Sequence, residues 1–126
     1  MDLQQMHHVA IIASDYARAK EFYVEKLGFP LIREVYREAR KDYILTLQFG
    51  DGEIELFIMP DPPARVSGPE ACGLRHLAFR VADIGAAVAE LKGKGIETEP
   101  IRMDPYTDRP FTFFKDPDGL PLELHE

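Results

Sequence analysis

The sequence predicts an α+β protein made of two tandem modules, each with the order strand, helix, strand, strand, strand. One observation is a repeat: the run that opens at His8 and closes at Asp15 recurs from His76 to Asp83, an offset of 68 residues. A second is that short apolar runs alternate with polar positions, which is typical of strands with one buried face. A third is that a helical apolar stripe follows each Asp, a preferred N-cap residue. Such a chain is expected to fold as a repeat of one supersecondary unit.

The first module is expected to span residues 1–59. Its elements are predicted in this order: a strand at 6–13, a helix from Asp15 to Leu27, and strands at 30–37, 43–49 and 53–59. Gly28 provides the left-handed residue that commonly ends a helix. Gly50 and Gly52 flank Asp51 in a run suited to a tight turn, so the last two strands are expected to form a hairpin.

The second module is expected to span residues 74–126 and to follow a linker at 60–73. The linker contains four prolines and two glycines, a composition that cannot sustain a regular element. The elements of the second module are predicted in this order: a strand at 74–81, an Asp83-capped helix ending near Gly93 to Gly95, a strand at 96–101, a loop at 102–110, and strands at 111–114 and 120–125. The run Asp116-Pro117-Asp118-Gly119 predicts the turn between the last two strands. The whole chain, 1–126, is expected to be one domain.

Composition and charge exclude several classes of function. With 126 residues, 45% of them hydrophobic and 29% charged, the chain has the size and composition of one globular domain. A net charge of −7 with scattered Lys and Arg argues against a nucleic-acid partner. No apolar run reaches the ~20 residues of a membrane span, and the first residues do not resemble a signal peptide. The single cysteine, Cys72, fits a reducing interior, so we expect a cytoplasmic protein whose partner is a small molecule.

His and Glu recur in register in the two modules. Glu55 lies 47 residues after His8, and Glu123 lies 47 residues after His76. Strand alternation puts each of these residues on the face opposite an aliphatic set that is suited to the core. Burying an unpaired carboxylate destabilises the fold by roughly several kcal/mol. Two buried carboxylates therefore require a cation that neutralises them. A divalent ion with two imidazole and two carboxylate ligands meets this need, and Zn²⁺, Ni²⁺, Co²⁺, Fe²⁺ or Mn²⁺ accepts such a set.

Each of these residues also has an ordinary structural interpretation. A single His at a strand start is more often a cap or a surface residue than a ligand, a single Glu on a strand usually faces solvent, and duplication alone leaves relics. Candidate substrate contacts share the faces of the four ligands or lie in the loop at 102–110, and they are Ile12, Phe57, Met59, Arg80, Tyr106, Arg109 and Phe113. For each Arg the alternative is a solvated surface residue, and for each aromatic residue it is plain core. His125 is interpreted as a rim or solvent residue.

Together these motifs resemble the vicinal oxygen chelate superfamily, and within it the glyoxalase I-like proteins (lactoylglutathione lyase/bleomycin resistance/dioxygenase). The resemblance covers essentially the whole chain. It rests on His8-Val-Ala-Ile with Asp15, Phe22-Tyr23-Val-Glu-Lys-Leu-Gly28-Phe29, Ile54-Glu55-Leu56, Arg75-His76-Leu77-Ala78-Phe79 and Asp116-Pro-Asp-Gly-Leu-Pro-Leu-Glu123. It implies paired modules that form an incompletely closed eight-stranded sheet, often in a homodimer. It also implies one divalent ion per site, with zinc, nickel or cobalt favoured, held by His8, Glu55, His76 and Glu123.

The resemblance implies a metal-dependent lyase or isomerase. The His/Glu/His/Glu set is similar to that of glyoxalase I-type enzymes, which transfer a proton next to a carbonyl through a metal-stabilised enediolate. Glu123 is expected to be the general base, with Glu55 as the second choice. Ile12 and Met59 stand where glutathione-using members have Arg and Asn, which puts the use of glutathione in doubt. The alternatives within the superfamily are a protein that binds an antibiotic or toxin without chemistry, and a metal-dependent dioxygenase.

Overall fold

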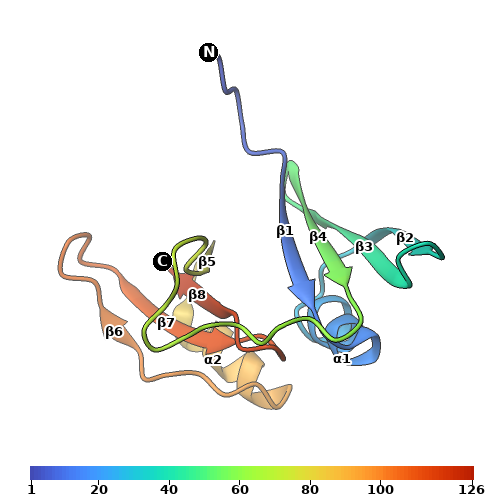
Figure 1. Ribbon diagram of the computed structural model, residues 1–126. Helices are drawn as coiled ribbons and strands as arrows, with labels where there is room; N and C mark the ends of the chain where they lie inside the picture. Colours follow the sequence, from blue (N-terminus) through green and yellow to red (C-terminus); the bar gives the residue numbers. More distant parts are fainter. The chain divides into compact units, whose positions relative to one another are not determined.

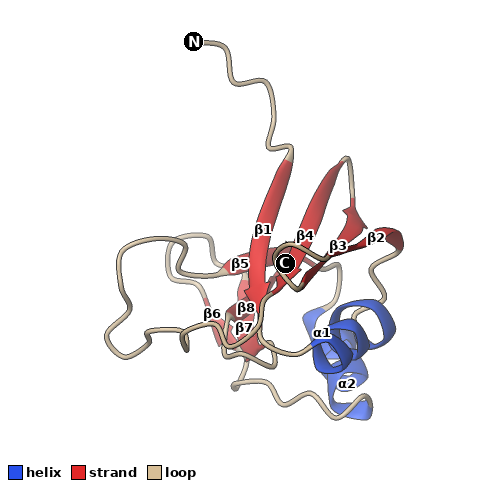
Figure 2. Cartoon of the chain, turned by 45° about the vertical axis from the view of Figure 1, so that its right-hand side comes forward, coloured by secondary structure: helices blue, strands red, loops and turns tan.

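The computed structural model describes residues 1–126 and confirms the predicted α+β class (Figure 1). The chain divides into two compact units, Met1–Ala64 (unit 1) and Arg65–Glu126 (unit 2). Each unit contains a strand, a helical segment and three further strands, and each has its own four-stranded sheet (Figure 2). No helix is both long and apolar enough to cross a membrane.

Unit 1 begins with a strand and a helical segment and ends with a three-stranded meander. Its elements are β1 (His8–Ala13), α1 (Tyr16–Lys20), the π-helix η1 (Glu21–Lys26), β2 (Leu31–Arg37), β3 (Asp42–Phe49) and β4 (Gly52–Ile58). The strand order in the sheet is β1-β4-β3-β2. β1 pairs parallel to β4, and the other neighbours pair antiparallel. The first strand therefore lies beside the last strand of its own unit.

Unit 2 repeats this topology. Its elements are β5 (Leu77–Arg80), α2 (Ile84–Gly93), β6 (Arg102–Met103), β7 (Pro110–Lys115) and β8 (Pro121–His125). The strand order is β5-β8-β7-β6, again with the first strand parallel to the last. The segment between β4 and β5 contains neither helix nor strand, as the run of prolines predicts.

The two helical segments start as the sequence predicts. The side chain of Asp15 accepts a hydrogen bond from the backbone N–H of Arg18 at 2.8 Å, and that of Asp83 accepts one from Ala86 at 2.9 Å. Each carboxylate thus satisfies one of the free N–H groups of a first helical turn. Gly28 has a φ of 79° and follows the first helical segment, as predicted for a residue that ends a helix.

Alternation along the strands separates a core face from an opposite face in both sheets. In β4, Ile54, Leu56 and Ile58 are buried while the residues between them are half-buried. In β8, Leu122 and Leu124 are buried in the same way. In unit 1, α1 packs against β4, and Tyr23 of η1 is fully buried. The predicted aliphatic face is therefore the core face, and the His and Glu positions lie on the other side.

The predicted strand at 96–101 is wrong. The third strand of unit 2 is the two-residue β6, which lies in the predicted loop and pairs Arg102 with Phe111. In the preceding segment only Glu99 bonds to β7: its N–H donates to the Phe113 carbonyl at 2.8 Å, and its carbonyl accepts from the Thr112 hydroxyl at 2.7 Å. Pro100 follows and has no N–H to donate, so a ladder cannot continue through it.

Candidate functional site

The first His–Glu pair joins the parallel strands β1 and β4. The ladder aligns Ala10 with Glu55, so His8 stands two residues before the strand partner of Glu55. Nε2 of His8 lies 3.5 Å from Oε2 of Glu55, and the two side chains are 43% and 21% exposed. Gly52, at the start of β4, helps to set this geometry: a Cβ there would lie 3.1 Å from the His7 carbonyl oxygen. The absence of a side chain at Gly52 lets the chain just before His8 lie close to β4.

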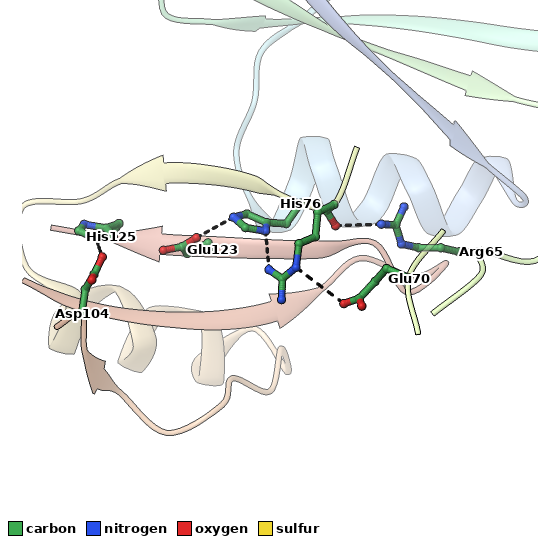
Figure 3. Close-up of polar contacts among 7 residues, drawn as sticks. Arg65, Glu70, His76, Asp104, Glu123 and His125 are labelled. Carbon is green, nitrogen blue, oxygen red and sulfur yellow. Dashed lines mark hydrogen bonds and ion pairs between the residues drawn. The ribbon is translucent and has the colours of Figure 1, made fainter. Parts of the chain in front are cut away.

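The second pair repeats the first. The ladder of β5 and β8 aligns Ala78 with Glu123, and His76 again stands two residues before that partner. Nε2 of His76 lies 2.9 Å from Oε2 of Glu123, with side-chain exposures of 26% and 12% (Figure 3). Each unit therefore presents one imidazole nitrogen and one carboxylate oxygen side by side, opposite its core face. The second pair is the closer and the more buried of the two.

The start of β8, and with it the position of Glu123, is fixed by a buried turn. Oδ1 of Asp116 accepts hydrogen bonds from the backbone N–H groups of Asp118, at 2.9 Å, and of Leu120, at 2.8 Å. Gly119 takes a φ of 87°, which other residues rarely adopt. The predicted Asp-Pro-Asp-Gly turn is therefore the element that starts β8 at Pro121.

The residue before each His contacts its second ring nitrogen. Nη1 of Arg75 lies 2.9 Å from Nδ1 of His76, and Nδ1 of His7 lies 2.9 Å from Nδ1 of His8. Arginine has only donors, so Nδ1 of His76 accepts and Nε2 carries the ring proton that faces Glu123. A metal ion bound at Nε2 would take the position of that proton. Neither unit alone gathers three or more His, Cys, Asp or Glu side chains in a group that could hold an ion.

Several predicted substrate contacts lie on the faces of the two pairs. Ile12 is 57% exposed on β1, and Phe57 and Met59 are half-buried on the Glu55 side of β4. In unit 2, the ring of Phe113 meets the ring of His76 edge to face, with centroids 5.1 Å apart. These four residues are apolar; Phe113 contacts a candidate ligand, and Ile12, Phe57 and Met59 lie further along the strand faces that carry the first pair.

The remaining predicted contacts are cationic or lie in the loop between β6 and β7. Arg80 is exposed, and its side chain has no hydrogen-bond or ion-pair partner. The N–H of Asp104 donates to the Arg109 carbonyl at 2.9 Å, which closes the loop, and the Tyr106 side chain is 95% exposed. Neither Tyr106 nor Arg109 forms a hydrogen bond or ion pair with the His76–Glu123 pair. Their role in binding stays a prediction.

Sequence reasoning assigned no role in the site to Asp104 or Arg33, and it interpreted His125 as a rim residue. Nε2 of His125 lies 3.4 Å from Oδ2 of Asp104 (Figure 3). The Glu126 carbonyl, and after it the Asp104 carboxylate, raise the pKa of His125, while the Tyr106 N–H lowers the pKa of Asp104. Alternation from Glu123 already puts His125 on the face of the pair, so that signal was present in the sequence.

Arg33 lies in unit 1 and is aligned with Thr46, which is aligned with Glu55. The Arg33 guanidinium donates to the Thr46 hydroxyl at 3.2 Å.

Comparison with known proteins shows the family to which the chain belongs. The family model of the Glyoxalase/Bleomycin resistance protein/Dioxygenase superfamily matches residues 5–124, and the chain belongs to this superfamily. It is 61% identical over 127 residues to the uncharacterized protein YwkD of Bacillus subtilis (strain 168), covering 100% of this chain and 99% of that one. The crystal structure of a glyoxalase family protein from Enterococcus faecalis is 56% identical, covers 100% of both chains and has a TM-score of 0.95.

Two more distant relatives have names that state an activity. One is a 2-epi-5-epi-valiolone epimerase from Actinomyces sp, 30% identical over 141 residues, covering 94% of this chain and 77% of that one. The other is the crystal structure of TnmS3, an antibiotic-binding protein from Streptomyces sp. CB03234, 26% identical with a TM-score of 0.74, covering 99% and 97%. The superfamily therefore includes enzymes as well as proteins that bind small molecules.

Proposed function

We propose that this protein is a metal-dependent lyase or isomerase that moves a proton next to a carbonyl, with His8, Glu55, His76 and Glu123 as ligands of one divalent ion. The observation that carries the proposal is the repetition of the His–Glu pair. In both units the His stands two residues before the strand partner of the Glu, and both side chains lie on the face that the core does not use. The identity to an epimerase supports an activity of this class.

The geometry of each pair fits two ligands of one ion. Ligands at ~2.1 Å from an ion are ~3.0 Å apart at right angles and ~3.4 Å apart at the tetrahedral angle. The separations of 3.5 Å in the first pair and 2.9 Å in the second are close to this range. A ring that binds through Nε2 carries its proton on Nδ1, so Arg75 must release His76 when an ion binds. Arg75 is 62% exposed and has room to do so.

In this proposal the chain's own residues bind the ion and move the proton. A bound divalent ion supplies Lewis acidity, polarising two vicinal substrate oxygens and offsetting the charge that develops when an adjacent C–H proton leaves. Glu123 takes that proton and returns it to the neighbouring carbon. It is the less exposed of the two carboxylates, at 12% against 21% for Glu55, so water competes less for the transferred proton. Glu55 is the alternative base.

Metal content tests the ligand set first. The protein is stripped with a chelator, reconstituted with zinc, nickel or cobalt, and analysed for bound metal per chain. Replacing His8 or His76 with Ala is expected to lower zinc affinity at least ~100-fold, since a direct ligand contributes more than the ~10–100-fold of its supporting contacts. Light scattering on the same samples measures the molar mass and so tests whether the protein is the expected homodimer. In a homodimer, the two His–Glu pairs of one site come either from one chain or from two copies.

Proton exchange tests the chemistry. Wild-type protein loaded with zinc is expected to exchange the C–H proton next to the carbonyl of suitable 2-hydroxy ketones and 2-oxo acids with D₂O, followed by NMR. Glu123→Gln is expected to lose this exchange. Glu53→Gln removes the same charge from β4 of unit 1, where Glu53 lies on the same face as Glu55 but is not one of the four proposed ligands, and it serves as the control. Absence of bound metal after reconstitution, or exchange by Glu123→Gln at the wild-type rate, would refute the proposal.

A binding protein without chemistry is the second candidate. It is favoured by the similarity to an antibiotic-binding protein and by the apolar residues Ile12, Phe57 and Met59 on the strand faces that carry the first pair. Incubation with candidate ligands separates the two functions, because a binding protein returns each ligand unchanged. Oxygen consumption with catechols would instead reveal a metal-dependent dioxygenase.

A further inference from the structure

A row of four residues lies next to Glu123 on the sheet of unit 2. The ladders align Arg80 with His125, His125 with Phe111, and Phe111 with Arg102. Residues aligned across neighbouring strands project from the same face. His125 stands two residues after Glu123 on β8, so this face is also the face of the His76–Glu123 pair. We call Arg80, His125, Phe111 and Arg102 the cationic row.

Only one charge of the cationic row is free. Arg102 donates to Glu99 at 2.9 Å, and its guanidinium carbon lies 4.9 Å from the centroid of the Phe111 ring. His125 stacks on Phe111 with the planes 17° apart, and its ring nitrogens face the Glu126 carbonyl and Asp104. Arg80 is exposed and has no side-chain partner. Arg80 is therefore the group in this row that is available to bind an anion.

The equivalent row in unit 1 has the opposite character. Ile12 and Phe57 stand 68 residues before Arg80 and His125, and the ladders continue the row through Ile44 to Val35. All four are apolar, and Ile12 and Val35 are 57% and 41% exposed. The two units thus share the His–Glu pair and differ in the row beside it.

Two arginines of unit 1 lie near its apolar row, but both are engaged. The Arg37 guanidinium lies 5.5 Å from the Phe57 ring centroid and pairs with the buried Asp42. Arg33 donates to the Thr46 hydroxyl at 3.2 Å. Neither offers a free charge comparable to that of Arg80.

We infer that the substrate of the proposed reaction is an acid with a second carboxylate beyond its metal-binding oxygens, and that Arg80 binds this distal carboxylate. The inference rests on the proposed function, because the bound ion must offset the charge of the adjacent Glu123. Consecutive residues on one face of a strand are ~7 Å apart. The distal carboxylate therefore lies a few bonds from the chelating oxygens.

Two ligands with the same chelating head test this inference. 2-Oxoglutarate and 2-oxopentanoate both present a carboxylate beside a keto oxygen, and only the first has a distal carboxylate. Calorimetry on zinc-loaded wild-type protein is expected to show that 2-oxoglutarate binds ~10-fold more tightly than 2-oxopentanoate. This difference is the contribution expected of a charge-assisted hydrogen bond at a site that water reaches. Arg80→Ile, which installs the residue found at the repeat-equivalent position, is expected to bring 2-oxoglutarate down to the affinity of 2-oxopentanoate. Arg33→Ile removes one charge from unit 1 and is expected to retain the preference.

The outcomes separate the two hypotheses. Equal binding of both acids to zinc-loaded wild-type protein would refute the anion subsite and leave the metal site standing. A preference that survives in Arg80→Ile, or disappears in Arg33→Ile, would overturn the assignment to Arg80. Protein that binds no zinc, or zinc-loaded protein that binds neither acid, would refute the proposed function and the subsite together.

Discussion

Replacing Asp116 with Ala removes the acceptor that organises the turn before β8. Its Oδ1 accepts from the N–H groups of Asp118 and Leu120, and Asp116 itself is only 5% exposed. Leu120 is 6% exposed, so in the variant its N–H has neither a protein acceptor nor water. A buried donor left without a partner costs about 1–3 kcal/mol. Water can reach the half-buried Asp118, whose lost bond costs about 1 kcal/mol.

These two losses give a total of about 2–4 kcal/mol for Asp116→Ala. With a urea dependence of about 2 kcal/mol per molar, the midpoint of unfolding is expected to fall by about 1–2 M. The unfolding of both proteins is followed by circular dichroism at pH 7. Since the turn also starts the strand that holds Glu123, the zinc affinity of the variant is expected to fall as well.

Asp116→Asn is the matched control for this experiment. Its amide oxygen can accept from the same two N–H groups, so we expect it to recover most of the lost stability. An Asp116→Ala midpoint within ~0.3 M of the wild-type value would contradict the argument. So would an Asn variant as unstable as the Ala variant, because the effect would then come from charge and not from the hydrogen bonds.

Three further predictions concern unit 1. The Arg37 guanidinium holds the pKa of Asp42 below its usual 3.8. The wild-type protein is therefore expected to be more stable than Asp42→Asn, fully so above pH 3.8, and to lose this advantage as the pH falls below 3.8. Urea unfolding between pH 6 and 2 checks this, and a constant advantage would count against it. Gly52→Ala, whose Cβ would meet the His7 carbonyl at 3.1 Å, is expected to weaken zinc binding, and unchanged affinity would show that β1 adjusts. Leu56→Ala in the fully buried core is expected to cost about 2–5 kcal/mol in the same unfolding assay, and a loss below ~1 kcal/mol would mean that the core refills.

The repeat has kept one feature and changed another. In both units a His stands two residues before the strand partner of a Glu, as the proposed metal site requires. The next row is apolar at Ile12 and cationic at Arg80. In the proposed chemistry the pairs determine the reaction, and the differing rows determine which molecule undergoes it.

Most of the fold follows from local patterns in the sequence. The strands of unit 1, the capping roles of Asp15 and Asp83 and the helix end at Gly28 were predicted because alternation, caps and glycine conformations depend on neighbouring residues. The π-helical turn at Glu21–Lys26 was not predicted. In this turn the Leu27 N–H donates to the Phe22 carbonyl, five residues earlier in the chain. Whether a helix forms such a π-helical turn depends on how it packs and not on its composition.

A strand was wrongly predicted at 96–101, and β6 was missed, for a related reason. An edge strand exists only where its partner provides hydrogen bonds, and β7 provides them to Glu99 and to β6. The apolar run that begins at Ile96 cannot reveal where the partner strand lies. Pro100, which interrupts the ladder, is the residue in the sequence that argues against a strand at 96–101.

The sequence by itself determined the candidate metal ligands and the sheet face that each of them occupies. The period of two along a strand fixes the face of His8, Glu55, His76 and Glu123 once the strands are assigned. Only the tertiary structure decided which His meets which Glu, because pairing depends on strand register between residues 47 positions apart. It also decided that Arg80 stands free beside His125, since hydrogen bonds and ion pairs to neighbouring strands cannot be read from spacing along the chain.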